Sequence, residues 1–137
     1  MLATHCGAPS APLPGKAVHG TAGSLLRVHP QRFWFVADRP DGQPDVQFAP
    51  DTGVVLDLSH ARAAIRVAAD VAVPLLSRFI AIDLRPDRFA VDDVAVTPLH
   101  RVSVVLWRRA DGIDILAPRS FARSTWELLA EAAERLR

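Results

Sequence analysis

The dipeptide Asp111-Gly112 narrows the possible folds of this chain more than any other feature, because it predicts a tight turn between two antiparallel strands. Centring the turn on this dipeptide sets Arg109 opposite Asp114 and Trp107 opposite Leu116. A cross-strand ion pair and an aromatic–aliphatic pair each contribute roughly 0.2–1 kcal/mol, and a shift by one residue would separate both. The sequence therefore predicts a hairpin with this register.

Two more strands are predicted in the middle of the chain. Residues 53–58 form a nearly continuous apolar run, which is typical of a strand buried on both faces. Residues 62–67 alternate instead, with Arg62 and Arg66 on one face and apolar side chains on the other. Such alternation is typical of a strand with one face on the core and the other toward water or another chain.

An earlier hairpin and a loop are predicted before these strands. Two apolar runs, 25–28 and 33–36, flank a turn that contains Pro30. Prolines and glycines then recur through residues 38–52, which favours a loop.

Two helices are predicted from capping residues and apolar spacing. Asp70 can cap a helix that runs to about Phe79, provided that Pro74 lies near its first turn. Ser120 can cap a final helix through about Leu136. The final helix is expected to place the following residues along one side: Phe121, Thr125, Trp126, Leu129, Ala133 and Leu136.

Together these elements predict an α+β fold in which an antiparallel or mixed sheet is packed by two helices. Residues 1–23 hold several prolines, glycines and small side chains, so we expect a flexible N-terminal segment there. Residues 24–137 are expected to form a single domain. A chain of 137 residues is of the usual size for one domain.

Charge and cysteine content exclude several function classes. The formal net charge is +1, so the charge balance indicates no nucleic-acid partner. Cys6 is the single cysteine, which rules out an internal disulfide and a thiolate metal cluster and fits a reducing cytoplasm. The start of the chain lacks the pattern of a secretory signal, and no apolar run approaches the ~20 residues that span a bilayer. We therefore expect a cytoplasmic protein without a membrane partner.

No complete catalytic or cofactor motif is present in the sequence. Asp57, Ser59 and His60 contain the residue types of a hydrolytic triad, but an extended segment would point His60 away from the other two. The histidines show no metal-ligand spacing, and no glycine-rich phosphate loop occurs. Arg119 and Ser120 leave three interpretations open: a helix cap, an anion at the helix start, or an ion pair between subunits.

Several motifs resemble one protein family when they are taken together. These are Val55-Leu-Asp-Leu-Ser-His-Ala-Arg62, Leu75-Leu-Ser-Arg78, Ile82-Asp-Leu-Arg-Pro86 and Pro118-Arg-Ser-Phe-Ala-Arg-Ser124, with Arg27-Val-His-Pro-Gln-Arg-Phe-Trp34 before them. The chain resembles the gamma subunit of heterotetrameric sarcosine oxidase over roughly residues 24–136. The Asp-Leu-Ser-His element also recurs in the wider superfamily of the glycine-cleavage T-protein, so a reduced T-protein-like, folate-binding architecture is implied.

The resemblance implies a non-catalytic structural subunit of a complex that oxidatively demethylates sarcosine to glycine. It places FAD, FMN, NAD and tetrahydrofolate on large alpha and beta subunits and zinc on a small delta subunit, with none bound by this chain. The alternative is a stand-alone folate-binding module. Seven residues are candidates for subunit contacts or motif functions: Asp57, Ser59, His60, Arg62, Arg66, Arg119 and Ser120.

The chain departs from the family at its N-terminus. Members of the family usually carry an extra strand–helix unit ahead of the matched region, where this sequence has a segment rich in proline and glycine. Loss of that unit would leave a sheet edge or an apolar face uncovered, which favours a place within a complex.

Overall fold

The computed structural model describes residues 2–137, and these divide into two compact units. Unit 1 ends at Asp57, and unit 2 runs from Leu58 to Arg137. Each unit has its own antiparallel sheet, so the predicted α+β class is confirmed, although the sequence predicted one sheet where the structure has two.

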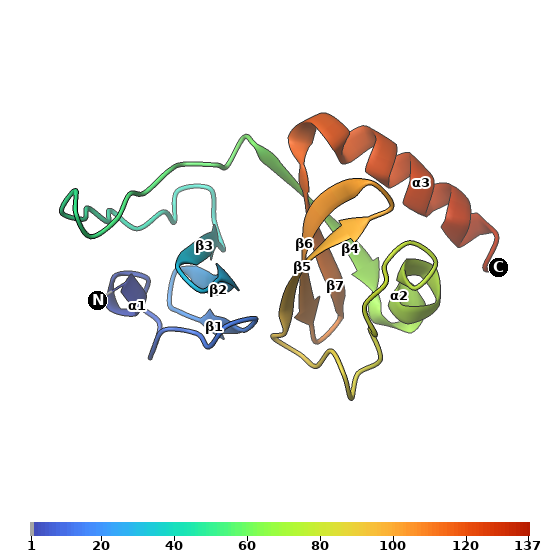
Figure 1. Ribbon diagram of the computed structural model, residues 1–137, viewed down its shortest axis with the longest axis horizontal. Helices are drawn as coiled ribbons and strands as arrows, with labels where there is room; N and C mark the ends of the chain where they lie inside the picture. Colours follow the sequence, from blue (N-terminus) through green and yellow to red (C-terminus); the bar gives the residue numbers. More distant parts are fainter. Residues whose placement is uncertain (1) are drawn as a thin grey trace. The chain divides into compact units, whose positions relative to one another are not determined.

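Unit 1 is a three-stranded antiparallel sheet with a short helix before it (Figure 1). Its elements are α1 (Leu2–His5), β1 (Ala17–His19), β2 (Gly23–His29) and β3 (Arg32–Ala37). The predicted hairpin is confirmed as β2 and β3, which turn at Pro30-Gln31. Residues 38–52 contain no helix or strand, as predicted for a loop.

The N-terminal segment contains regular structure that the sequence did not predict. Strand β1 pairs with β2 through Ala17 opposite Leu26, and Cys6 is 2% exposed. The glycines and prolines shape tight turns around this strand: Gly7 and Gly15 both have positive φ, a conformation that favours glycine. Composition predicted a flexible segment, but residues 2–23 contain a helix and a strand, because pairing with β2 holds β1 in an extended conformation.

Unit 2 is a four-stranded antiparallel sheet in the order β4-β7-β6-β5, with two helices packed on one face (Figure 1). Its elements are β4 (Arg62–Ala68), α2 (Ala69–Leu76), β5 (Val94–Leu99), β6 (Val102–Arg109), β7 (Gly112–Pro118), the 3-10 turn η1 (Arg119–Phe121) and α3 (Ala122–Glu134). The core between sheet and helices includes the fully buried Leu76, Leu106, Ile113, Ile115 and Ala117.

Strand β4 alternates as predicted, with Ile65 and Val67 buried and Arg66 outward. The sequence analysis did not predict strand β5. Its Pro98 has no backbone N–H to donate to the hydrogen bonds between strands, which disfavours a strand. It is an edge strand, where such a proline is tolerated.

The β6–β7 hairpin exists, but its predicted register was wrong by two residues. Trp107 lies opposite Asp114, and Arg109 lies opposite Gly112, so the turn is Ala110-Asp111. Gly112 is needed within the strand instead: a Cβ there would lie 2.2 Å from the Val67 carbonyl oxygen of β4. Because the shift is even, each side chain keeps its predicted face.

Neither helix begins as predicted. Helix α2 starts at Ala69 and ends at Leu76, with no side-chain cap and with Pro74 inside it. Helix α3 starts at Ala122 after η1, and Ser120 makes no cap hydrogen bond. Its buried residues are Thr125, Leu129 and Ala132, and the helix contacts α2, β4 and β7.

Candidate functional site

Two of the motifs that point to the family meet in unit 2, where β4 begins and β7 ends. Arg62 lies opposite Pro118 in the antiparallel ladder, and the Arg119 backbone N–H donates to the Ala61 carbonyl at 2.9 Å. Segments almost sixty residues apart in the sequence are therefore joined by the backbone. We call Ser59, His60, Arg119, Ser120 and Phe121 the strand-end surface.

The strand-end surface is open to solvent throughout. Ser59 and His60 are exposed in a turn that precedes β4, and Arg119 and Ser120 are exposed in η1. Phe121 is 48% exposed, which is high for an aromatic side chain. Exposed polar groups together with a half-exposed aromatic ring are more typical of a contact surface than of an enclosed reaction site.

The apolar run at residues 53–58 corrects a prediction. The sequence predicted a buried strand, but the structure assigns no strand there, and the side chains are exposed. Val54 is 78% exposed and Leu56 is 69% exposed. Asp57, the candidate residue in this run, is exposed as well. A continuous apolar segment in this state is typical of a surface that another molecule covers.

Arg62 and Arg66 lie on the same face of β4, as the alternation predicted. Arg66 is held by a bidentate ion pair: its Nε donates to Asp114 Oδ1 at 2.6 Å, and a terminal nitrogen donates to Oδ2 at 2.9 Å. Its other terminal nitrogen reaches Asp111 at 3.1 Å. These hydrogen bonds, chiefly those to Asp114, raise the pKa of the Arg66 guanidinium.

Arg109 shares this cluster but does not have the role that the sequence predicted for it. Its guanidinium lies 3.6 Å from Asp114, whose oxygens already accept from Arg66, and it stacks 4.0 Å from the centre of the Trp107 ring. The predicted Arg109–Asp114 pair therefore exists as a secondary contact. The sequence missed Arg66 as the main partner because the pairing of β4 with β7, which places Arg66 opposite Asp114, joins strands that are distant in the sequence.

Arg108 is a residue whose importance the sequence reading missed. It is 6% exposed, and its guanidinium donates to the Phe89 carbonyl at 2.9 Å and also to the Leu84 carbonyl. Burial lowers the pKa of this guanidinium, with the nearby Asp93 acting in the opposite sense. Its position two and four residues after Leu106 and Val104 was the available signal, since alternate residues of a strand lie on the same face and both of these are buried.

Helix α3 presents a second exposed aromatic side chain. Trp126 is 59% exposed, although the sequence predicted that it would face the core with Phe121. The ion pair Arg123–Glu127, at 2.8 Å, lies on the exposed side of the same helix. The helix therefore buries Thr125, Leu129 and Ala132 and displays Trp126, its largest side chain.

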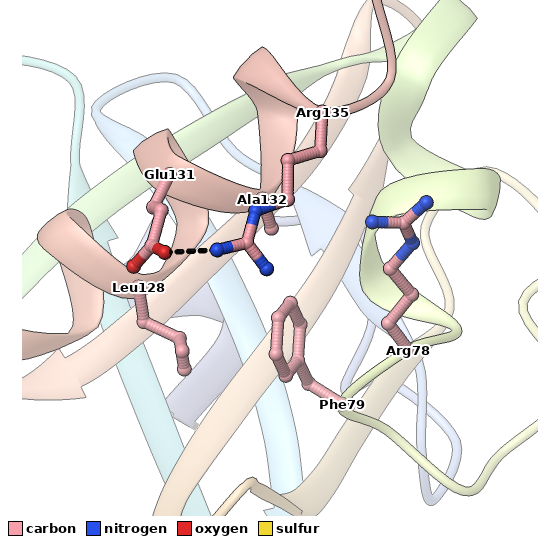
Figure 2. A pocket seen from close by; sticks show the side chains of 6 residues that line it. All are labelled: Arg78, Phe79, Leu128, Glu131, Ala132 and Arg135. Carbon is pink, nitrogen blue, oxygen red and sulfur yellow. Dashed lines mark hydrogen bonds and ion pairs between the residues drawn. The ribbon is translucent and has the colours of Figure 1, made fainter.

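Figure 2 shows a hollow of about 230 Å³ between α3 and the segment that follows α2. The Glu131–Arg135 ion pair, at 2.5 Å, spans its α3 side, and Phe79 and Arg78 line the other side. A volume below 300 Å³ is small for a ligand pocket.

The structure was also searched for side chains that could bind a metal ion. Among residues 2–137, no group of three or more His, Cys, Asp or Glu side chains is arranged to hold a metal ion. Cys6 is buried, which raises the pKa of its thiol. Within the same residues, no helix is long and apolar enough to cross a membrane.

Comparison with solved structures finds chains that resemble this one. A chain of heterotetrameric sarcosine oxidase from Corynebacterium sp. U-96, solved in complex with pyrrole 2-carboxylate, superposes with a TM-score of 0.80 and 25% sequence identity. The match covers 98% of this chain and 71% of the sarcosine oxidase chain. The chain resembles a sarcosine oxidase subunit. No protein-family model matches it, and no curated protein matches it.

The structural match agrees with the family resemblance that the motifs indicated. It includes nearly the whole chain, and therefore both the strand-end surface and the apolar run 53–58. The α+β fold with a small sheet in each unit is the fold of that sarcosine oxidase chain.

Proposed function

We propose that this chain is a non-catalytic structural subunit, of the gamma type, in a sarcosine-oxidase-like heterotetramer that oxidatively demethylates sarcosine to glycine. The observation that carries this proposal is the match to a chain of heterotetrameric sarcosine oxidase over 98% of the sequence. A similarity that spans the full chain argues for a subunit of the same kind of assembly, since it is not confined to one common motif.

Exposed apolar side chains support a role in assembly. The run 53–58 and the aromatic residues Phe121 and Trp126 are large hydrophobic groups that face solvent in the chain alone. Burial of such side chains at an interface releases roughly 25 cal/mol for each square ångström removed from water. Partner subunits would provide that burial.

In this proposal the chemistry belongs to the partners. Large alpha and beta subunits carry FAD, FMN, NAD and tetrahydrofolate, and a small delta subunit carries zinc. The candidate residues Asp57, Ser59, His60, Arg62, Arg119 and Ser120 then serve contacts between subunits. Arg66 stabilises unit 2 through Asp114 and acts on the interface only by holding β4 in place.

Co-expression tests the proposal. The chain is produced with the large flavin-binding subunits of a sarcosine oxidase from the same organism, and the complex is isolated through a tag on a large subunit. We expect the chain to co-purify in stoichiometric amount and the complex to oxidise sarcosine. The chain alone is expected to show no flavin absorbance and no sarcosine oxidation.

Substitutions in the apolar run sharpen this test. The double variant Val54→Asp/Leu56→Asp is expected to lower the recovery of the chain in the complex at least tenfold. The matched control is Val96→Asp, which places the same charge on an exposed valine of the edge strand β5. If the chain never co-purifies with the large subunits, the proposal is wrong.

Titration with tetrahydrofolate separates the alternative function. A stand-alone folate-binding module would release heat on titration and gain thermal stability without any partner. A structural subunit of the proposed kind gives neither signal.

A further inference from the structure

Strand β4 lies at one end of the four-stranded sheet of unit 2 and pairs on one side with β7. Its seven residues form a ladder with β7 without a bulge, from Arg62 opposite Pro118 to Ala68 opposite Gly112. Within residues 2–137 no strand pairs with the other side of β4. We call that side the open edge of β4.

Hydrogen bonds at the two ends of β4 show which residues bond toward β7. The Arg119 N–H donates to the Ala61 carbonyl at 2.9 Å, and the Ala69 N–H donates to the Asp111 carbonyl at 3.1 Å. Both bonds involve an odd-numbered residue at an end of β4. Because the backbone groups of successive residues in a strand point to opposite sides, the odd-numbered residues between them bond toward β7 as well.

The even-numbered residues of β4 consequently direct their backbone N–H and C=O groups toward the open edge. These residues include Ala64, Arg66 and Ala68, and all three are exposed. Outward N–H and C=O groups along a strand are a template for pairing with a further strand. The short side chains of the two alanines leave this template accessible.

The opposite edge of the same sheet is protected against such pairing. The Arg108 N–H donates to the Asp93 carbonyl at 2.9 Å, so the even-numbered residues of β5 point outward by the same rule. Pro98 is one of them, and its nitrogen has no hydrogen to offer to a further strand. Proline on an edge strand is a common protection against pairing, and β4 contains none.

The arginines of β4 disfavour a second copy of this chain as the partner of the open edge. Arg62 and Arg66 lie four residues apart on the same face of the strand. Two β4 strands could pair antiparallel through their even-numbered residues. Each register that overlaps most of β4 then sets an arginine of one copy directly opposite or diagonally next to an arginine of the other, and like charges so placed destabilise the pairing. A strand of a different chain avoids this repulsion.

We propose that the open edge of β4 receives an extended segment of a partner subunit, which adds a fifth strand to the sheet of unit 2. Backbone groups of the segment pair with those of Ala64, Arg66 and Ala68. On the helix side the segment presents apolar side chains beside the buried Ile65 and Val67, and on the other side it carries no basic residue. This inference rests on the proposed function, because the segment belongs to the same assembly.

Hydrogen exchange, resolved residue by residue, tests the added strand in the unmodified chain. In the chain alone we expect the amides of Ala64 and Arg66 to exchange quickly, since they point out of the sheet. In the complex with the large flavin-binding subunits their exchange should slow at least tenfold. Ala63 and Ile65 are the internal control, because their amides bond to β7 and are protected in both states. Fast exchange of Ala64 and Arg66 in the complex overturns the inference.

A proline variant tests the same edge through binding. In Ala64→Pro the outward N–H is lost and the ring obstructs a further strand, so we expect the Kd of the chain for the large subunits to rise more than tenfold. The ladder with β7 is retained, because the N–H of residue 64 does not donate to it. The matched control is Val96→Pro, which removes an outward N–H from the other edge strand and should leave the Kd within twofold. Thermal unfolding shows that each variant is folded.

Cross-linking identifies the chain that supplies the strand. Ala64→Cys is labelled with a photoreactive maleimide, and the buried Cys6 is far less accessible to the reagent. We expect irradiation of the complex to join this position to a peptide of a partner subunit. A cross-link to a second copy of this chain overturns the inference.

The added strand and the proposed function fail in different ways. A complex that forms with unchanged affinity in Ala64→Pro, and in which Ala64 and Arg66 of the unmodified chain exchange as fast as in the chain alone, overturns the added strand but leaves the structural subunit intact. Failure of the unmodified chain to bind the large subunits removes both.

Discussion

Arg66 of β4 lies directly opposite Asp114 of β7, and its guanidinium donates to both oxygens of that carboxylate. The Asp114 side chain is only 9% exposed, whereas that of Arg66 is 48% exposed. A charged arginine thus covers a nearly buried carboxylate from the solvent side. The pair joins β4, the first strand of unit 2, to β7, its last strand.

Removal of this arginine should weaken unit 2. In Arg66→Ala the Asp114 carboxylate loses two charge-assisted hydrogen bonds, which are worth roughly 1.5–3 kcal/mol of unfolding free energy in total at this partly exposed site. Urea unfolding measures the loss. The control is Arg123→Ala, which breaks a solvent-exposed i,i+4 pair and should cost about 0.5 kcal/mol or less. Equal effects of the two variants would contradict the special position of Arg66.

Arg108→Met should loosen the 84–93 loop. The substitution keeps an unbranched apolar stem but leaves the buried carbonyls of Leu84 and Phe89 without their hydrogen-bond donor. Each unpaired carbonyl should lower the free energy of unfolding by at most about 1–3 kcal/mol. Hydrogen exchange of the Phe89 and Asp92 amides is expected to accelerate at least tenfold. Arg88→Met, on the same loop but exposed, should leave these rates unchanged.

Gly112→Ala and Gly53→Ala should have opposite effects on stability. A Cβ on Gly112 would collide with the Val67 carbonyl oxygen, so β4 and β7 must separate, which costs about 1–3 kcal/mol. A Cβ on Gly53 would meet nothing closer than the Phe48 ring at 3.8 Å. There the loss of chain entropy in the unfolded state should stabilise by up to about 1 kcal/mol. Thermal unfolding of both variants checks the difference in sign.

The Asp83 carboxylate should titrate well below its usual range. Hydrogen bonds from the Arg85 side chain and backbone N–H lower the pKa of Asp83 to about 2. Because the folded pKa lies below the unfolded value of roughly 3.9, the stabilisation is present above about pH 4 and is lost as the pH falls toward 2. Carboxyl carbon chemical shifts give the midpoint directly. In Arg85→Ala the midpoint should rise toward 4 without reaching it, because the backbone N–H of residue 85 still donates to Asp83, and an unchanged midpoint would contradict this origin.

The elements that sequence patterns predicted well are those whose pairing partners lie nearby in the chain. The β2–β3 hairpin and the alternation of β4 are present as expected. The β6–β7 hairpin has the predicted faces but a different turn, since the demand for glycine at position 112 comes from β4, a strand distant in sequence. Local turn preferences could not reveal that contact.

The candidate site was predictable only in part. The sequence did single out the two segments that meet at the strand-end surface, because the family resemblance rested on them. It could not reveal that the run 53–58 is exposed. An apolar pattern shows that a segment favours burial, but it does not show whether the same chain or another molecule covers the segment. The burial of Arg108 and the exposure of Trp126 also depend on tertiary packing that no local pattern encodes.

The order of strands in unit 2 has a consequence for biosynthesis. Arg66 and Asp114, which pair across β4 and β7, are 48 residues apart, so β4 is synthesised before β7, its neighbour in the described sheet. Until β7 emerges from the ribosome, the nascent chain carries β4 without this partner and the adjoining apolar run uncovered. Contacts so distant in sequence slow folding, and unpaired strand edges favour aggregation in the meantime.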